Sequence, residues 1–185
     1  MEDKTIIDLY WKRSEEAITQ TDVKYGRYCY SIAYNVLTNQ QDAEESVSDT
    51  YMAAWNHIPP ARPTVLSTFL GRITRNISIS RWRARGAQCR GRGETALAFE
   101  ELEECISGRE SIENEYMKKE TLKVLNRFLE TLPKENRMVF MRRYWYLDPI
   151  ANIAAKYGFS QSKVKTMLHR DRQKLKQLLT KEGYV

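Results

Sequence analysis

The sequence contains few of the residues that build disulfide, metal or nucleophilic sites. It has three cysteines and two histidines among 185 residues. Cys29, Cys89 and Cys105 lie far apart and form no C-x-x-C pair, which excludes a disulfide framework and a zinc site with the usual local spacing. We therefore expect reduced thiols, no bound metal and no cofactor.

Other motifs are missing as well. The sequence has no phosphate-binding glycine loop, no H-x-E motif and no plausible catalytic triad, so we expect a protein that is not an enzyme. No stretch approaches the roughly 20 apolar residues that cross a membrane, and the first residues contain no apolar run typical of a signal peptide. These observations favour a cytoplasmic protein with no membrane insertion.

Alternation typical of β-strands is not convincing anywhere, and apolar residues recur instead at helical spacing. We expect an all-α protein whose turns fall at prolines and glycines. The helical stripes comprise Tyr25, Tyr28, Ile32, Val36 and Leu37, then Val47, Tyr51 and Trp55, then Phe69, Leu70, Ile73, Ile77 and Trp82, and finally Leu122, Leu125, Leu129 and Leu132.

Charge is distributed in blocks that the net charge of +6 conceals. Residues 1–60 carry a net −5, residues 61–93 a net +8, residues 94–116 a net −7 and residues 117–185 a net +10. Two basic segments separated by an acidic one suit contact with a polyanion at two places. We predict two small helical domains, residues 1–85 with helices from about residue 20, and residues 118–185, joined by an acidic flexible linker, residues 86–117, with at most a short helix.

The sharpest local motif lies near the C-terminus. Pro149 suits the first turn of a helix, Gly158 suits a tight turn with positive φ, and Ser160 suits the N-cap of a second helix. Ala154, Gly158 and Val164 have the spacing that a DNA-binding helix-turn-helix requires. An ordinary helical hairpin with solvated lysines is the alternative, but the outward basic face favours DNA binding. The residues predicted to contact DNA are Ser160, Gln161, Ser162, Lys163, Lys165, Thr166, His169 and Arg170.

The first domain contains a basic helix and an acidic one. Arginines surround an apolar stripe between residues 72 and 92, which indicates contact with a phosphate backbone, and Trp82 fits the core better than a stacking platform. The preceding helix carries an acidic patch that suits a solvated or protein-binding face better than a metal site.

Four segments together resemble the extracytoplasmic-function branch of bacterial sigma factors. They are D-A-E-E-S-V-S-D-T-Y-M-A-A-W (42–55), F-L-G-R-I-T-R-N (69–76), L-P-K-E-N-R-M-V-F (132–140) and V-K-T-M-L-H-R-D-R-Q-K-L (164–175). They occur in the family's order and spacing and, with the segments between them, span about two thirds of the chain.

The resemblance implies a sigma factor that binds core RNA polymerase and directs promoter recognition, promoter melting and transcription initiation. The first domain would be sigma region two and the second sigma region four, which would read the minus-thirty-five element as duplex. An anti-sigma factor is a further partner that the family often has. The polymerase would contact Asp42, Glu44, Glu45, Ser48 and Asp49. The melted strand of the minus-ten element would contact Arg62, Arg72, Arg75, Asn76, Arg81 and Arg83.

Asp171 departs from the family, which has a small residue on the recognition helix at this place. It lies three residues after Leu168 and four before Leu175, so we predict that it is buried. An unpaired buried carboxylate is costly, so we predict an arginine partner; a slight rotation of the helix would instead bring Asp171 to water. The candidate partners are Arg137, Arg142 and Arg143.

A stand-alone helix-turn-helix regulator that binds duplex DNA is the rival hypothesis. Such a protein needs a dimer interface or a ligand pocket in its first domain. An acidic helix followed by a cluster of arginines fits polymerase and single-stranded DNA better.

Overall fold

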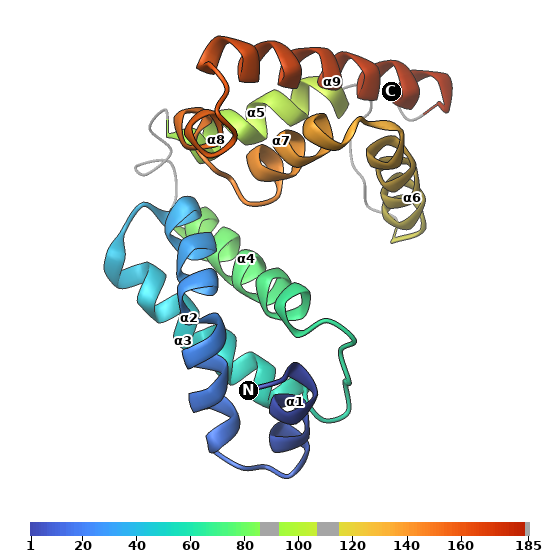
Figure 1. Cartoon of the computed structure of the whole chain (residues 1–185). Helices are drawn as coiled ribbons and strands as arrows, with labels where there is room; N and C mark the ends of the chain where they lie inside the picture. Colours follow the sequence, from blue (N-terminus) through green and yellow to red (C-terminus); the bar gives the residue numbers. More distant parts are fainter. Residues whose placement is uncertain (86–92, 107–114, 184–185) are drawn as a thin grey trace. The chain divides into compact units, whose positions relative to one another are not determined.

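The computed structural model describes residues 1–85, 93–106 and 115–183, with the side chains of 106 and 115–122 excluded (Figure 1). Within these ranges α-helix is the only regular secondary structure besides turns. The chain divides into two compact units, residues 1–91 and residues 92–185. The predicted all-α, two-domain architecture is therefore confirmed. None of the described helices is both long and apolar enough to cross a membrane.

Three long helices form the body of the first unit: α2 (Glu16–Leu37), α3 (Gln40–His57) and α4 (Leu66–Ala84). Asn39 opens α3, because its side-chain oxygen accepts a hydrogen bond from the backbone N–H of Asp42 at 3.0 Å. The three helices enclose a core whose buried members include Cys29, Val47, Tyr51, Ala54, Leu66 and Leu70.

A shorter helix, α1 (Asp3–Trp11), completes this unit and precedes the first helix expected from the periodicity. Tyr10 is fully buried and shares a 2.9 Å hydrogen bond with the hydroxyl of Thr21 on α2. Asp3 accepts hydrogen bonds from Lys24 and Tyr25, also on α2. These contacts attach the N-terminal residues to the unit.

The second unit contains α5 (Glu94–Ile106), α6 (Glu115–Thr131), α7 (Lys134–Tyr144), α8 (Ile150–Tyr157) and α9 (Gln161–Lys181). Each of the other four helices contacts α9, which is the longest element of the unit in Figure 1. The core joins residues from all of them, including Ala98, Val124, Phe128, Val139, Phe140, Ile153, Leu168 and Leu175.

The position of α5 differs from the sequence-based expectation. The sequence predicts that residues 94–106 belong to a linker with at most a short helix, but they form a 13-residue helix that packs on α7 and α9. The reason is packing against distant segments: Thr95, Ala98 and Cys105 are buried against the rest of the unit, while Glu100, Glu103 and Glu104 remain exposed to solvent. The last residues of the predicted linker, 115–117, belong to α6. Residues 86–92 and 107–114, with Cys89, Arg90, Arg92 and Arg109, lie outside the described residues.

Candidate nucleic-acid interface

The turn between α8 and α9 has the geometry of the predicted helix-turn-helix. Gly158 ends α8 in the left-handed region, at φ +66°, where a side chain would be strained. Ser160 opens α9 by accepting a hydrogen bond from the backbone N–H of Lys163 at 3.1 Å. Ala154 and Val164 are both buried, as close crossing of the two helices requires.

The outward face of α9 brings together all of the predicted duplex-reading residues. All eight are exposed in the second unit. Three of them already make contacts: Ser160 caps the helix, Thr166 donates to the backbone oxygen of Ser162, and the ammonium of Lys163 lies 3.6 Å from the ring centre of Phe159. Gln161, Lys165, His169 and Arg170 extend the same polar face, which suits both base edges and phosphates.

Asp171 lies on the inward face of α9 and is 0 % exposed, as predicted. The predicted arginine partner is wrong: the side-chain amide of Asn136 on α7 donates to both carboxylate oxygens, at 3.1 and 2.9 Å. The three candidate arginines are engaged elsewhere or face water, since Arg137 is exposed, Arg142 pairs with Asp148 and Arg143 pairs with carboxylates of α5.

Burial raises the pKa of Asp171, against the smaller opposing effects of Asn136 and Lys174. A carboxyl whose pKa is higher in the folded than in the unfolded state stabilises the fold below the unfolded pKa. It costs stability as the pH rises through the folded pKa. The requirement to desolvate or protonate the Asp171 carboxyl therefore weakens the second unit at neutral pH.

We expect Asp171→Ala to raise the thermal midpoint of the second unit at pH 7 by a few degrees, corresponding to about 1 kcal/mol. The variant removes a desolvated charge and introduces a better helix former, and the half-buried Asn136 can turn to water. The gain should shrink as the pH falls through the raised pKa of Asp171 toward 3.8, the ordinary Asp value, because the folded protein takes up this proton before the unfolded chain does. Thermal unfolding of the full chain at pH 4 and pH 7 measures this difference; a larger gain at pH 4 would contradict the raised pKa of the buried Asp171 carboxyl.

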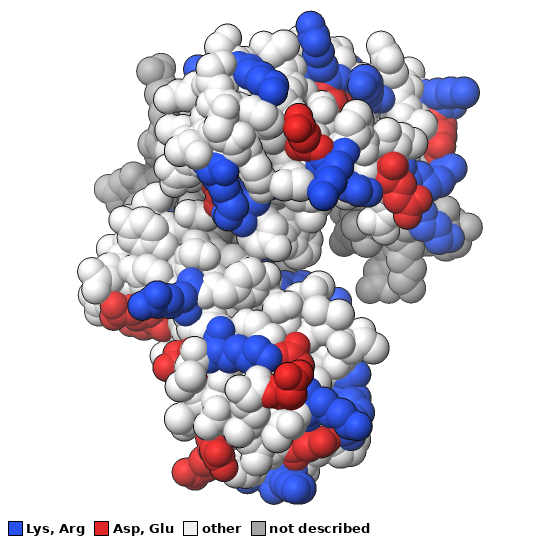
Figure 2. Space-filling view, in the orientation of Figure 1, with Lys and Arg blue, Asp and Glu red and all other residues white. Residues whose placement is uncertain are grey.

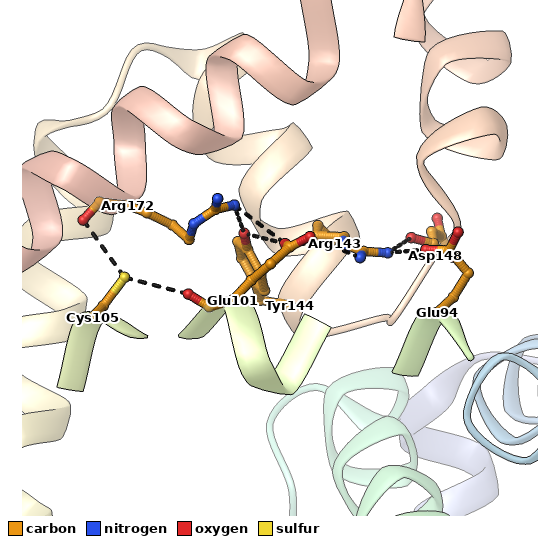
Figure 3. A network of polar contacts seen from close by, with 7 residues as sticks. All are labelled: Glu94, Glu101, Cys105, Arg143, Tyr144, Asp148 and Arg172. Carbon is orange, nitrogen blue, oxygen red and sulfur yellow. Dashed lines mark hydrogen bonds and ion pairs between the residues drawn. The ribbon is translucent and has the colours of Figure 1, made fainter. Parts of the chain in front are cut away.

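A polar network joins α5 to α7 and α9 (Figure 3). Arg143 is 1 % exposed and donates to Glu94 at 2.5 Å and to Glu101 at 3.1 Å. Glu101 also accepts hydrogen bonds from the hydroxyl of Tyr144 at 2.8 Å and from Arg172 at 3.2 Å. One carboxylate of α5 thus contacts side chains from two other helices.

The electrostatics of this network favour its charged form. Burial alone would lower the pKa of Arg143, but the hydrogen-bonded Glu101 and the nearby Glu94 outweigh it, and the pKa lies above its ordinary value. Burial raises the pKa of Tyr144, which keeps its hydroxyl protonated as a donor. The thiol of Cys105, buried beside them, contacts the backbone oxygens of Glu101 and Arg172, and burial raises its pKa.

In the first unit, the predicted DNA-binding arginines of α4 differ in their surroundings. Arg72, Asn76 and Arg83 are exposed. Arg81 is held by Glu45 and, at 2.7 Å, by Asp49, and the Glu45 contact raises its pKa against the effect of burial. Burial and the neighbouring Arg83 lower the pKa of the half-buried Arg75.

The remaining predicted members of this set lie apart from one another. Arg62, in the loop before α4, pairs with Asp8 and lies over the ring of Trp11. Trp82 on α4 is half-buried. Its burial is therefore intermediate between the two predicted alternatives, a core residue and an exposed stacking platform.

The five residues predicted to contact polymerase lie on two sides of α3 rather than on one. Asp42, Glu45 and Asp49 face α4, where Arg85 and Arg81 neutralise them. Glu44 and Ser48 are exposed on the side of α2 and line a cavity of about 560 Å³ that Asp22, Arg27, Tyr30 and Tyr51 also line.

Acidic and basic side chains also lie next to one another on the visible face of the first unit (Figure 2). Sequence reasoning missed the partners because α3 and α4 carry their charges on separate segments: Arg81 pairs with residues 32 and 36 positions away. The opposite charges of the two segments were the sequence feature that could have indicated this pairing. Among the described residues no group of three or more His, Cys, Asp or Glu could hold a metal ion.

Comparison with known families agrees with the division into two units. The family model described as sigma-70 region 2 matches residues 23–88, and the model described as sigma-70, region 4 matches residues 122–175. A search of curated proteins gave no significant match. The two matches follow the order of the units and fall on α2–α4 and on α6–α9. The chain therefore belongs to the sigma-70 family, as a sigma factor of the extracytoplasmic-function type that acts in transcription initiation.

Proposed function

We propose that this sigma factor binds core RNA polymerase and directs it to a two-part promoter, which it helps to melt. The observation that carries the proposal is the exposed surface of the helix-turn-helix. It presents eight polar or basic residues, namely the N-cap Ser160 and seven residues of α9. A helix of this kind enters the major groove and reads base edges with its first turns. The second unit is thus suited to the minus-thirty-five element in duplex form.

The first unit is suited to the minus-ten element after melting. Arg72, Asn76 and Arg83 are exposed on one helix and can follow the backbone of an unpaired strand. The loop 59–66, which carries Arg62, precedes this helix and is the expected place for a flipped base.

The acidic residues of α3 are the proposed contact with polymerase. Glu44 and Ser48 are exposed beside a cavity between α2 and α3, so a basic helical partner can reach both helices at once. We also propose that the protein acts in the cytoplasm and that an anti-sigma factor can cover one or both units.

The rival, a stand-alone regulator of duplex DNA, shares the second unit but not the exposed basic helix of the first. Transcription in vitro separates the two hypotheses. Core polymerase, the full chain and DNA from upstream of its own gene should give a transcript with a defined start, and neither protein alone should do so. A chain that binds this DNA but neither binds core polymerase nor yields a transcript would be a regulator instead.

Substitutions on α9 should separate phosphate contacts from base contacts. Lys165→Ala should weaken binding to every promoter and reduce the salt slope of binding by about one. Gln161→Ala or Arg170→Ala should change the preference among promoters, by about 1–3 kcal/mol for each lost base contact. Binding to a panel of promoter duplexes at several salt concentrations measures both effects; equal scaling of all promoters by all three variants would contradict the assignment of base readers.

A further inference from the structure

We propose that α5 is an autoinhibitory helix: docked on α7 and α9, it occupies cations that the second unit uses on DNA, and its release strengthens DNA binding. The inference rests on the proposed function, because it requires the second unit to bind duplex DNA. It concerns a segment that lies outside the residues matched by either family model.

The charged residues of α5 are all acidic. Its 13 residues contain five glutamates and no basic residue. The surface beneath it presents Arg143 and Arg172, and both guanidinium groups bind Glu101. An acidic helix thus occupies a basic surface on the unit that has to bind a polyanion.

The position of α5 brings its carboxylates close to the recognition helix. Its C-terminal part and α9 line a cavity of about 340 Å³, with Glu104 and Cys105 on one side and His169, Arg172 and Lys176 on the other. His169 belongs to the exposed face of α9 that is proposed to contact DNA. Phosphates that approach this flank of α9 therefore meet negative charge from α5.

The attachment of α5 combines limited apolar burial with polar contacts. Thr95, Ala98 and Cys105 are buried along the described part of the helix, and Ala96, Phe99 and Leu102 are half-buried. An isolated helix of this length is marginal in water, so α5 needs its partners to stay folded. Glu101 is the central contact, because it binds Arg143, Tyr144 and Arg172. Loss of this carboxylate should release α5 without removing any residue proposed to contact DNA.

Release of α5 should change the salt dependence of DNA binding as well as the affinity. Each additional phosphate contact steepens the slope of log K against log salt by about 0.9. Arg143, Arg172 and Lys176 are the cations that α5 covers or flanks. This electrostatic part of binding is independent of sequence, so a 20-bp duplex of arbitrary sequence is a sufficient probe.

The test compares Glu101→Gln with Glu103→Gln in the full chain. Both variants remove one negative charge from α5, but Glu103 is exposed and belongs to no described contact of the network. Docking of α5 is read from the rate at which the buried thiol of Cys105 reacts with a thiol reagent, with peptide mapping to separate it from Cys29 and Cys89. Binding to the duplex is measured by fluorescence anisotropy at several salt concentrations.

We expect Glu101→Gln to increase the labelling rate of Cys105 at least about tenfold, because it removes one partner of a buried ion pair. Its duplex affinity should rise about fivefold or more, and its salt slope should steepen by about one to two. Glu103→Gln should leave the labelling rate unchanged and alter the affinity by less than about twofold. Faster labelling with unchanged DNA binding would overturn the proposal, as would unchanged labelling or equal effects of the two variants.

A peptide provides a second test that does not depend on the stability of the variant. Residues 93–106 as a synthetic peptide, added to the Glu101→Gln protein, should weaken duplex binding again, and the same peptide with the Glu101→Gln change should do so less. Equal effects of the two peptides would contradict the role of Glu101. The transcription assay tests the proposed function separately: a chain that initiates transcription but shows no difference between the two variants refutes only the autoinhibition.

Discussion

Arg143→Ala should destabilise the second unit by about 3–5 kcal/mol and leave the first unit unchanged. Arg143 is 1 % exposed and holds Glu94 and Glu101 of α5. The substitution leaves a cavity in place of this large buried side chain and breaks the contacts that attach α5, and large-to-small changes at buried positions cost about this much in other proteins. In a unit of this size the loss corresponds to a fall in the thermal midpoint of at least about 10 °C.

The two buried cysteines allow the loss to be assigned to a unit. Cys29 lies in the core of the first unit and Cys105 in the second. Thiol labelling during unfolding should therefore show earlier exposure of Cys105 and unchanged exposure of Cys29. Arg137→Ala, an exposed change on the same helix, is the control and should alter stability by less than about 0.5 kcal/mol. Similar effects of the two substitutions would show that the network contributes little.

The double variant Glu44→Lys, Asp49→Lys should weaken binding to core polymerase by about 100-fold or more. Both side chains are exposed on α3, and the ion pair of Asp49 with Arg81 is itself exposed, so its loss should cost at most about 1 kcal/mol and the fold should tolerate the change. Like charges across an interface cost several kcal/mol, and the proposed partner surface is basic. Pull-down and anisotropy with purified core polymerase measure the effect.

A matched control reverses the same number of charges elsewhere in the first unit. Glu15 and Glu16 are exposed at the start of α2 and play no proposed part in polymerase binding. Glu15→Lys, Glu16→Lys should therefore keep its polymerase affinity within a few-fold. If both double variants lose affinity equally, the contact depends on the overall charge of the unit and not on α3.

Local features of the fold could be predicted well from the sequence. The turn at Gly158, the cap at Ser160 and the inward position of Asp171 depend on residues a few positions apart, and the structure confirms all three. Glycine at positive φ and serine at an N-cap have few alternatives. The pattern of apolar residues likewise indicated the long helices of both units.

Contacts between distant segments could not be predicted in the same way. The sequence gives the charge of Arg143 but not which carboxylate it meets, and Glu101 lies 42 positions away. Charge complementarity predicts an arginine partner for Asp171. The turn of α7 that faces Asp171 instead presents the side-chain amide of Asn136. Helix α5 was missed because its buried side is narrow and its glutamates are typical of a solvated segment.

The ion pairs between α3 and α4 have a thermodynamic consequence for assembly. Arg81 is held by Glu45 and Asp49, so a partner that binds these carboxylates displaces it and leaves it available to phosphate. Linkage makes the effect reciprocal: DNA that takes Arg81 raises the affinity of the acidic helix for its partner by the same factor. Because each exposed ion pair contributes at most about 1 kcal/mol, each of the two pairs adds at most about fivefold to this cooperativity.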